Sequence, residues 1–230
     1  MLEMLGNIVF PPLCLHCEER LDKGGRLICK ACASFFELID PETRCPYCFT
    51  ENGGSAPCCE CVEKRRWGLQ VGAALEYFGP VATFVKKMKR GGMPYLAKTG
   101  GAFLFGQFQT LGWPMPDLLI PIPRRSWLQG TNHATLLALS LGKLLGVPVR
   151  EWVKRTSGDL SQARLSSSQR EALAGENFFL KKKAKIEGKV ILIIDDVRTT
   201  GTTLRCTAQA LKEGFPKRLY ALTLARAGFD

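Results

Sequence analysis

Two adjacent carboxylates, Asp195 and Asp196, follow directly on a run of aliphatic residues. The stretch from Val190 to Thr203 reads VILIIDDVRTTGTT. An uninterrupted aliphatic run is typical of a strand that is buried on both faces. Small residues after such a strand allow the backbone to turn, so that successive amides face one concavity. The pattern therefore predicts a buried strand that delivers two acids and a hydroxyl-rich turn to one place.

A turn of this kind at the start of a helix is suited to binding a phosphate, because the free N–H groups and the helix dipole both favour an anion. Hydroxyl donors can come from four threonines, Thr199, Thr200, Thr202 and Thr203. Two carboxylates can accept hydrogen bonds from the vicinal hydroxyls of a ribose, or attract Mg²⁺. Together these groups describe a site for a phosphorylated sugar. The simpler alternative is a helix N-cap at Thr200 or Thr202, with the acids as ordinary strand-end residues.

Eight of the ten cysteines form four Cys-x-x-Cys pairs near the N-terminus. The pairs are Cys14/Cys17, Cys29/Cys32, Cys45/Cys48 and Cys58/Cys61. A two-residue gap aims two sulfurs at one metal, and two pairs complete a tetrahedral structural site. The first and second pairs are separated by 11 residues, and the third and fourth by 9. These short gaps suit two metal sites in series. The alternative is an interleaved arrangement, in which the first pair shares a site with the third. Cys59 could replace Cys58 as a ligand.

Zinc is favoured over disulfides, because repeated Cys-x-x-Cys spacing suits a metal and a cytoplasmic chain keeps its thiols reduced. Two structural Zn²⁺ ions are therefore predicted, and they supply the folding energy of a region with few aliphatic residues. His16 is expected to be a solvated or supporting group, and Cys206 a small packing residue.

The composition is that of a globular protein, and no apolar run is long enough to span a bilayer. The first residues carry an acid, Glu3, and no long apolar segment, so export is not expected and the cytoplasm is the predicted location. The formal net charge is +11. Basic clusters at 64–66, 86–90, 124–125 and 181–183 can be solvated surface or a patch that follows a nucleic-acid backbone.

From residue 67 onward strands and helices are expected to alternate. Strands are predicted at 72–78, 118–123, 189–194 and 218–224, and helices at 81–89, 94–111, 135–145 and 203–212. Residues 155–175 lack apolar periodicity and are predicted to form a mobile loop. Alternation with fully apolar strands indicates an α/β fold with a mainly parallel sheet covered by helices on both faces. Ligands of such sheets gather at the carboxyl ends of the strands, where the two acids are expected.

The motif Asp195-Asp196-Val197-x-Thr199-Thr200-Gly201-x-Thr203 resembles the phosphoribosyl pyrophosphate (PRPP) signature of type I phosphoribosyltransferases. The chain as a whole resembles the ComF family of competence-associated proteins. In that family a Phe-Pro-Pro-x-Cys-x-x-Cys opening and further knuckles precede a phosphoribosyltransferase-like domain. The resemblance implies a double zinc ribbon at 1–66 and a type I phosphoribosyltransferase-like domain at 67–230.

The resemblance also implies residue roles. Asp195 and Asp196 are the expected catalytic residues and bind the ribose hydroxyls, while the 5′-phosphate is bound by Thr199, Thr200, Gly201, Thr202 and Thr203. The segment from Pro121 to His133 resembles the family's pyrophosphate loop, although Gln129 replaces its usual Arg and His133 its Gln. Candidate residues of this loop are Arg124, Arg125, Gly130, Asn132 and His133. Residues 155–162 and 166–170 resemble the family's flexible loop.

Two functions follow from the resemblance. The first is transfer of a pentosyl group from magnesium-bound PRPP to an unidentified acceptor, linked to DNA uptake and competence. The alternative is a non-catalytic PRPP sensor, or a factor that binds single-stranded DNA during natural transformation together with uptake or recombination proteins. A purely structural adaptor is a third. Hypoxanthine and guanine are disfavoured as acceptors because Thr199 stands where those relatives place an acid. The sequence predicts no oligomeric state.

Overall fold

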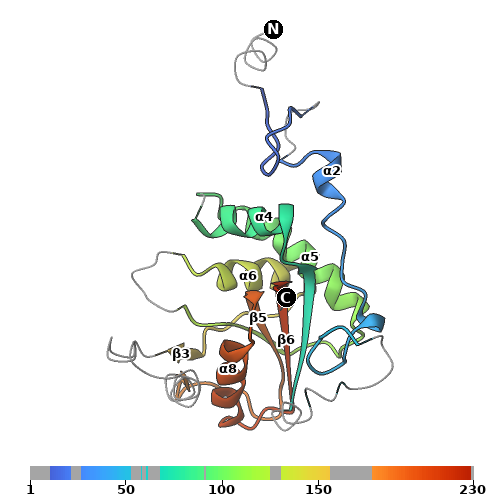
Figure 1. The fold of residues 1–230 in the computed structure, drawn as a ribbon. Coiled ribbons are helices and arrows are strands. Elements are labelled where there is room, and N and C mark those ends of the chain that lie inside the picture. The colour runs from blue at the N-terminus through green and yellow to red at the C-terminus, as the bar shows by residue number, and fades with distance from the viewer. Residues whose placement is uncertain are drawn as a thin grey trace, which may run out of the picture.

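The computed structural model describes residues 11–21, 27–52, 58, 61, 68–90, 92–124, 131–155 and 178–228. In Figure 1 a sheet flanked by helices forms the body, and the N-terminal part of the chain runs from above α4 down beside the sheet. Within these ranges no helix combines the length and the apolar character needed to cross a membrane. The predicted domain boundary at 66/67 lies outside the described residues.

The central sheet has four parallel strands in the order β1-β6-β5-β2. The strands are β1 (Leu69–Glu76), β2 (Leu118–Pro121), β5 (Val190–Arg198) and β6 (Arg218–Arg226). Their aliphatic side chains are almost fully buried on both faces, as the continuous apolar runs predict. The prediction of a parallel sheet is confirmed. The predicted end of β5 at residue 194 is wrong, because β6 continues alongside and supplies partners as far as Arg198.

Helices cover both faces of the sheet, which confirms the predicted α/β architecture. One face carries α4 (Gly79–Arg90), α5 (Leu96–Thr110) and α6 (His133–Leu145), and the other carries α8 (Thr202–Lys212). The helix α6 begins at Asn132, whose side chain accepts a hydrogen bond from the Ala134 amide, and ends at Gly146 in the left-handed conformation. The helices α5 and α6 approach closely, since a Cβ at Gly101 would lie 2.2 Å from the Ser140 hydroxyl oxygen.

A small antiparallel pair, β3 (Val153–Arg155) and β4 (Phe178–Leu180), lies beside α8 and was not predicted. The residues between these strands, 156–177, include most of the predicted mobile loop and lie outside the described residues.

The N-terminal module covers the outer edge of β1. It contains a short helix, α2 (Lys30–Ala33), and a single 3₁₀ turn, η1 (Pro41–Thr43). The Val71 amide donates to the Tyr47 carbonyl at 3.0 Å, and the Ile39 amide donates to the Ala74 carbonyl at 3.0 Å. These bonds satisfy backbone groups that an edge strand would leave open.

Candidate functional site

The two acids lie within β5 rather than after it. Asp195 is in register with Thr223 of β6, and the strand continues for two residues beyond Asp196. Both acids remain close to the carboxyl edge of the sheet, where the carbonyl of Arg198 accepts a hydrogen bond from the Ala227 amide at 2.9 Å. A strand paired at its very end holds the acids more rigidly than a loop would.

The two carboxylates have different electrostatic surroundings. Asp196 forms an ion pair with Lys89 of α4, in which the ammonium nitrogen lies 2.6 Å from a carboxylate oxygen. Burial, and to a smaller extent the neighbouring Asp196 carboxylate, raise the pKa of Asp195 from 3.8 to about 8. One carboxylate is therefore paired with a cation, while the other, Asp195, holds a proton near neutral pH.

The turn after β5 has the form expected of an anion site. Gly201 is the N-cap of α8 and adopts the left-handed conformation, with φ of 76° and no side-chain capping bond. The predicted alternative of an N-cap at Thr200 or Thr202 is wrong, and their hydroxyls instead lie 3.0 Å from each other. The turn and Asp195 line a cavity of about 30 Å³. The Thr202 amide donates to the Thr200 hydroxyl at 3.4 Å, whereas the N-cap residue Gly201 supplies no capping side chain.

A larger cavity of about 490 Å³ lies beside the acids. It brings together residues from five separate segments, among them Lys89, Arg90, Arg124, Asn132, His133, Arg155, Asp195, Asp196 and Thr203. The predicted residues Arg124, Asn132 and His133 therefore share one cavity with both acids. Arg125 and Gly130 lie outside the described residues.

Three of the cations around this cavity were not predicted as site residues. Lys89 and Arg90 had been grouped with a surface cluster, and Arg155 with the mobile loop. Lys89 directly follows Met88, a buried residue of the apolar stripe of α4. Its position next to this buried stripe is the feature of the sequence that could have indicated a role for Lys89 in the site. Arg155 packs over the ring of Phe178 at 5.1 Å, which fixes it across the β3–β4 pair.

The cysteines form two groups of four in series, and the interleaved alternative is therefore wrong. In each group the four sulfurs lie within 4.8 Å of one another. The groups are Cys14, Cys17, Cys29 and Cys32, and Cys45, Cys48, Cys58 and Cys61. The separations of 3.6 Å for Cys17 to Cys29 and 3.3 Å for Cys48 to Cys58 exclude disulfides, whose S–S length is about 2.05 Å.

These separations fit a metal site, because tetrahedral zinc with Zn–S bonds of about 2.3 Å places its sulfurs about 3.8 Å apart. The Cys58 amide lies 3.4 Å from the Cys45 sulfur, so that a backbone donor faces a thiolate. Burial raises the pKa of Cys45, but backbone donors outweigh it and lower this pKa to about 6. Burial and neighbouring sulfurs raise the pKa of Cys58 to about 12. Each group can hold a metal ion, whose charge would let all four sulfurs ionise.

The spare side chains behave as predicted. A ring nitrogen of His16 lies 2.8 Å from the Thr83 hydroxyl, so this residue joins the first cysteine group to α4. Cys206 belongs to α8 and is buried in the core on the side of this helix that faces the sheet. Cys59 lies outside the described residues, while Cys58 is part of the second group.

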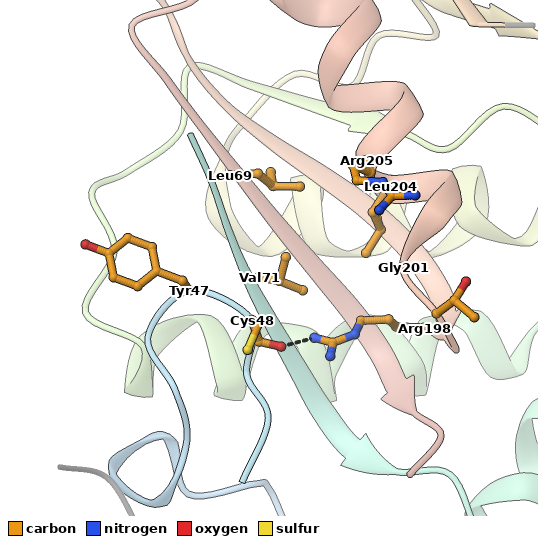
Figure 2. Close-up of a pocket in the computed structure, with 9 residues that line it drawn as sticks. Tyr47, Cys48, Leu69, Val71, Arg198, Gly201, Leu204 and Arg205 are labelled. Atoms are coloured by element: carbon orange, nitrogen blue, oxygen red, sulfur yellow. Dashed lines mark hydrogen bonds between the residues drawn. The ribbon is translucent and has the colours of Figure 1, made fainter. Parts of the chain in front are cut away.

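The second cysteine group is joined to the end of β5. Figure 2 shows Arg198 reaching from the strand end to donate a hydrogen bond to the Cys48 carbonyl. The two residues border a small pocket that Tyr47, Leu69, Gly201 and others complete. The neighbouring carbonyls of the same knuckle are also bound, that of Tyr47 by β1 and that of Phe49 by Arg226 at 2.5 Å. Three consecutive carbonyls of the knuckle are therefore bound by the sheet.

Comparisons with known proteins agree with this architecture. Residues 97–228 match the model of the phosphoribosyl transferase domain. The chain is 28% identical to "DNA utilization protein YhgH" of Shigella flexneri over 213 residues, which is 89% of this chain and 92% of the relative.

Two further relatives carry competence in their names. "Competence protein F" of Haemophilus influenzae is 26% identical over 93% of this chain and 96% of its own length. "Competence protein ComFC" of Streptococcus pneumoniae is 28% identical over 86% and 87%. Together with its paired cysteine groups and parallel sheet, these matches show that the chain belongs to the phosphoribosyl transferase domain family, as a member of its ComF group.

Proposed function

We propose that this protein binds magnesium-bound PRPP and transfers its phosphoribosyl group to an acceptor. The observation that carries the proposal is the single cavity of about 490 Å³ that joins the two acids to lysine and arginine side chains from three other segments and to Asn132 and His133 from a fourth. The turn from Thr199 to Thr203 adjoins Asp195 and supplies the phosphate site. A ligand with a phosphate, a ribose and a diphosphate has complementary groups for each of these parts.

In this proposal the protein contributes positioning and charge rather than a nucleophile. Asp195 and Asp196 accept hydrogen bonds from the two ribose hydroxyls, and the amides and hydroxyls of the turn bind the 5′-phosphate. Arg124, Asn132 and His133 lie where they can bind the diphosphate. Magnesium, when bound, neutralises the departing pyrophosphate. The negative charge carried by the acid pair stabilises the positive charge that develops at the anomeric carbon as the bond to pyrophosphate breaks.

The acceptor is constrained at one position. Thr199 has a neutral side chain, and its exposure leaves it able to contact a bound molecule next to the ribose. An acceptor held by an acid at this position, as hypoxanthine or guanine is in related enzymes, is therefore not proposed.

Each cysteine group is proposed to bind one structural Zn²⁺. The donor set of four sulfurs is the one that zinc prefers in closed structural sites. Thiolate ligands need a reducing compartment, which supports a cytoplasmic location. The module and the phosphoribosyltransferase-like part are proposed to divide near residue 66/67.

Titration calorimetry with PRPP and Mg²⁺ tests the proposal directly. The zinc-loaded protein is expected to bind PRPP, and the double variant Asp195→Asn with Asp196→Asn is expected to lose magnesium-dependent pyrophosphate release. Glu213→Gln is the control, because this exposed acid lies at the far end of α8. Turnover that survives in the double variant would show that the acids are not the site.

A second candidate function is binding of single-stranded DNA in competence. The names of the relatives favour it, and so do the exposed Lys86, Lys87, Lys182 and Lys183. Binding should fall with salt and persist in the double-acid variant. Neutralising Lys86 and Lys87 should reduce the slope of log affinity against log salt by about 1.4, since each phosphate contact contributes about 0.7. A salt-independent affinity would contradict this electrostatic account.

A further inference from the structure

The basic residues at the end of α4 differ in whether they reach the large cavity. Lys86 and Lys87 are exposed and do not line it, whereas Lys89, which is half-buried, and Arg90, which is exposed at the rim, do. The difference follows from the apolar face of the helix, where Val81, Phe84, Val85 and Met88 are buried and fix its rotation. The side chain of Lys89 retains 32% of its exposure, so its ammonium can change partners without leaving water entirely.

The ammonium of Lys89 forms an ion pair with Asp196. The separation of 2.6 Å is that of a close, charge-assisted contact, and the Asp196 side chain is only 16% exposed. Asp196 is also one of the two carboxylates proposed to accept the ribose hydroxyls. A sugar that uses this carboxylate must therefore compete with Lys89 or displace it.

Displacement has a different outcome for two kinds of sugar phosphate. A ribose 5-phosphate offers the ammonium no second anion near the anomeric carbon, so the broken ion pair is a net loss. A ligand with a diphosphate at that carbon places several anionic oxygens in the cavity that Lys89 lines together with Arg124 and His133. The ammonium can then exchange one anionic partner for another.

We propose that Lys89 is a specificity-determining residue, which selects sugar phosphates that carry a diphosphate at the anomeric carbon over those that do not. It does so by occupying Asp196 in the empty site and pairing with the diphosphate in the filled one. The inference rests on the proposed function, because it assumes that the ribose hydroxyls bind at the acid pair.

The test compares two ligands on matched variants of the zinc-loaded full chain. Calorimetry measures the affinity for PRPP and for ribose 5-phosphate, both with Mg²⁺, in the wild type, Lys89→Gln and Lys87→Gln. Lys89→Gln should weaken PRPP binding about tenfold or more, the usual size of one charge-assisted contact, and leave ribose 5-phosphate unchanged or tighter. Lys87→Gln removes the same charge from an exposed site on the same helix and should change neither affinity. Lys89→Arg should retain the preference for PRPP.

The outcomes separate this inference from the function on which it rests. Equal weakening of both ligands in Lys89→Gln, or no change in either, would overturn the selecting role and leave PRPP binding intact. A wild-type protein that binds neither ligand would overturn the proposed function, and this inference with it. If Lys89→Gln does not fold, Lys89→Arg still decides the matter, since a guanidinium that loses the preference for PRPP would contradict charge-based selection.

Discussion

Arg198, three residues before Gly201 in the turn that follows β5, donates a guanidinium hydrogen bond to the carbonyl of Cys48, a member of the second cysteine group. Residues separated by 150 positions in the chain are thus directly bonded. A metal that orders the knuckle around Cys48 also orders the partner of Arg198. The end of β5, from which the turn begins, is therefore expected to depend on metal in the second group.

Removal of metal should loosen the phosphate turn without loosening the whole sheet. Hydrogen exchange measured with and without a chelator should accelerate in residues 198–203 and in β1, whose edge the module covers. Strand β2 lies at the opposite edge of the sheet and is the internal control. Cys45→Ser in the second group should reproduce the effect, and Cys17→Ser in the first group should not. Equal acceleration in β2 would indicate general unfolding instead.

Replacing Arg198 by Met should weaken the same connection without touching the cysteines. The variant keeps an apolar stem but leaves the Cys48 carbonyl without this donor, which should lower the free energy of unfolding by about 1–3 kcal/mol. Affinity for ribose 5-phosphate should fall as well, because the adjoining turn loses its support. Arg218→Met at the exposed start of β6 is the control. Urea denaturation and calorimetry measure the two effects.

The raised pKa of Asp195 predicts a pH-dependent stability with a definite sign. Between its ordinary pKa of 3.8 and the folded value of about 8, the folded protein holds a proton that the unfolded chain has lost. Stability contributed by this group therefore falls as pH rises through that window. Asp195→Asn should become progressively more stable than the wild type from about pH 4 to about pH 8, with no further gain above it.

Urea denaturation of both proteins across this range checks the prediction, and their difference cancels the acid sensitivity of the cysteine groups that they share. Glu213→Gln, an exposed acid, should show no such trend relative to the wild type. A constant difference between Asp195→Asn and the wild type would contradict the burial of a protonated Asp195.

Gln107 ties α5 to the N-terminal module. Its side chain is fully buried, and its amide nitrogen donates to the Ile39 carbonyl at 2.8 Å. Gln107→Leu should destabilise the protein by about 1–3 kcal/mol, because the buried carbonyl loses its donor. Gln109→Leu, at an exposed position on the same helix, is the matched control. Thermal unfolding of the two variants should differ, and equal midpoints would show that this bond is dispensable.

The local patterns in the sequence predicted most of the secondary structure. Continuous aliphatic runs located β2, β5 and β6, since such runs reflect burial on both faces. The same runs misplaced the end of β5, because pairing of Asp195, Val197 and Arg198 with β6 extends the strand past the aliphatic residues. Strand β1 has no such run, and its predicted start at residue 72 is wrong, because the strand begins at Leu69. The pair β3 and β4 was missed, because strands of three residues carry too little periodicity to recognise.

The site could be predicted only in part for a related reason. Asp195, Asp196 and the turn are contiguous in sequence, so their chemistry is visible in a short motif. Lys89 approaches them from a helix more than a hundred positions earlier, and its role depends on how α4 is rotated. The interleaved arrangement of the cysteine pairs stayed open as an alternative, whereas the four Cys-x-x-Cys pairs themselves were predictable, because close spacing defines them. The bonds to the carbonyls of Tyr47, Cys48 and Phe49 were not, since every residue has a carbonyl.

The covered edge of β1 has a practical consequence for anyone who shortens this chain. A fragment beginning at Gly68 would keep all four strands of the sheet, yet its outermost strand would present unsatisfied amides such as that of Val71. Exposed strand edges recruit other strands, so two copies of the fragment would tend to join edge to edge and precipitate. By pairing with this edge, the cysteine-rich module is expected to prevent self-association of the sheet.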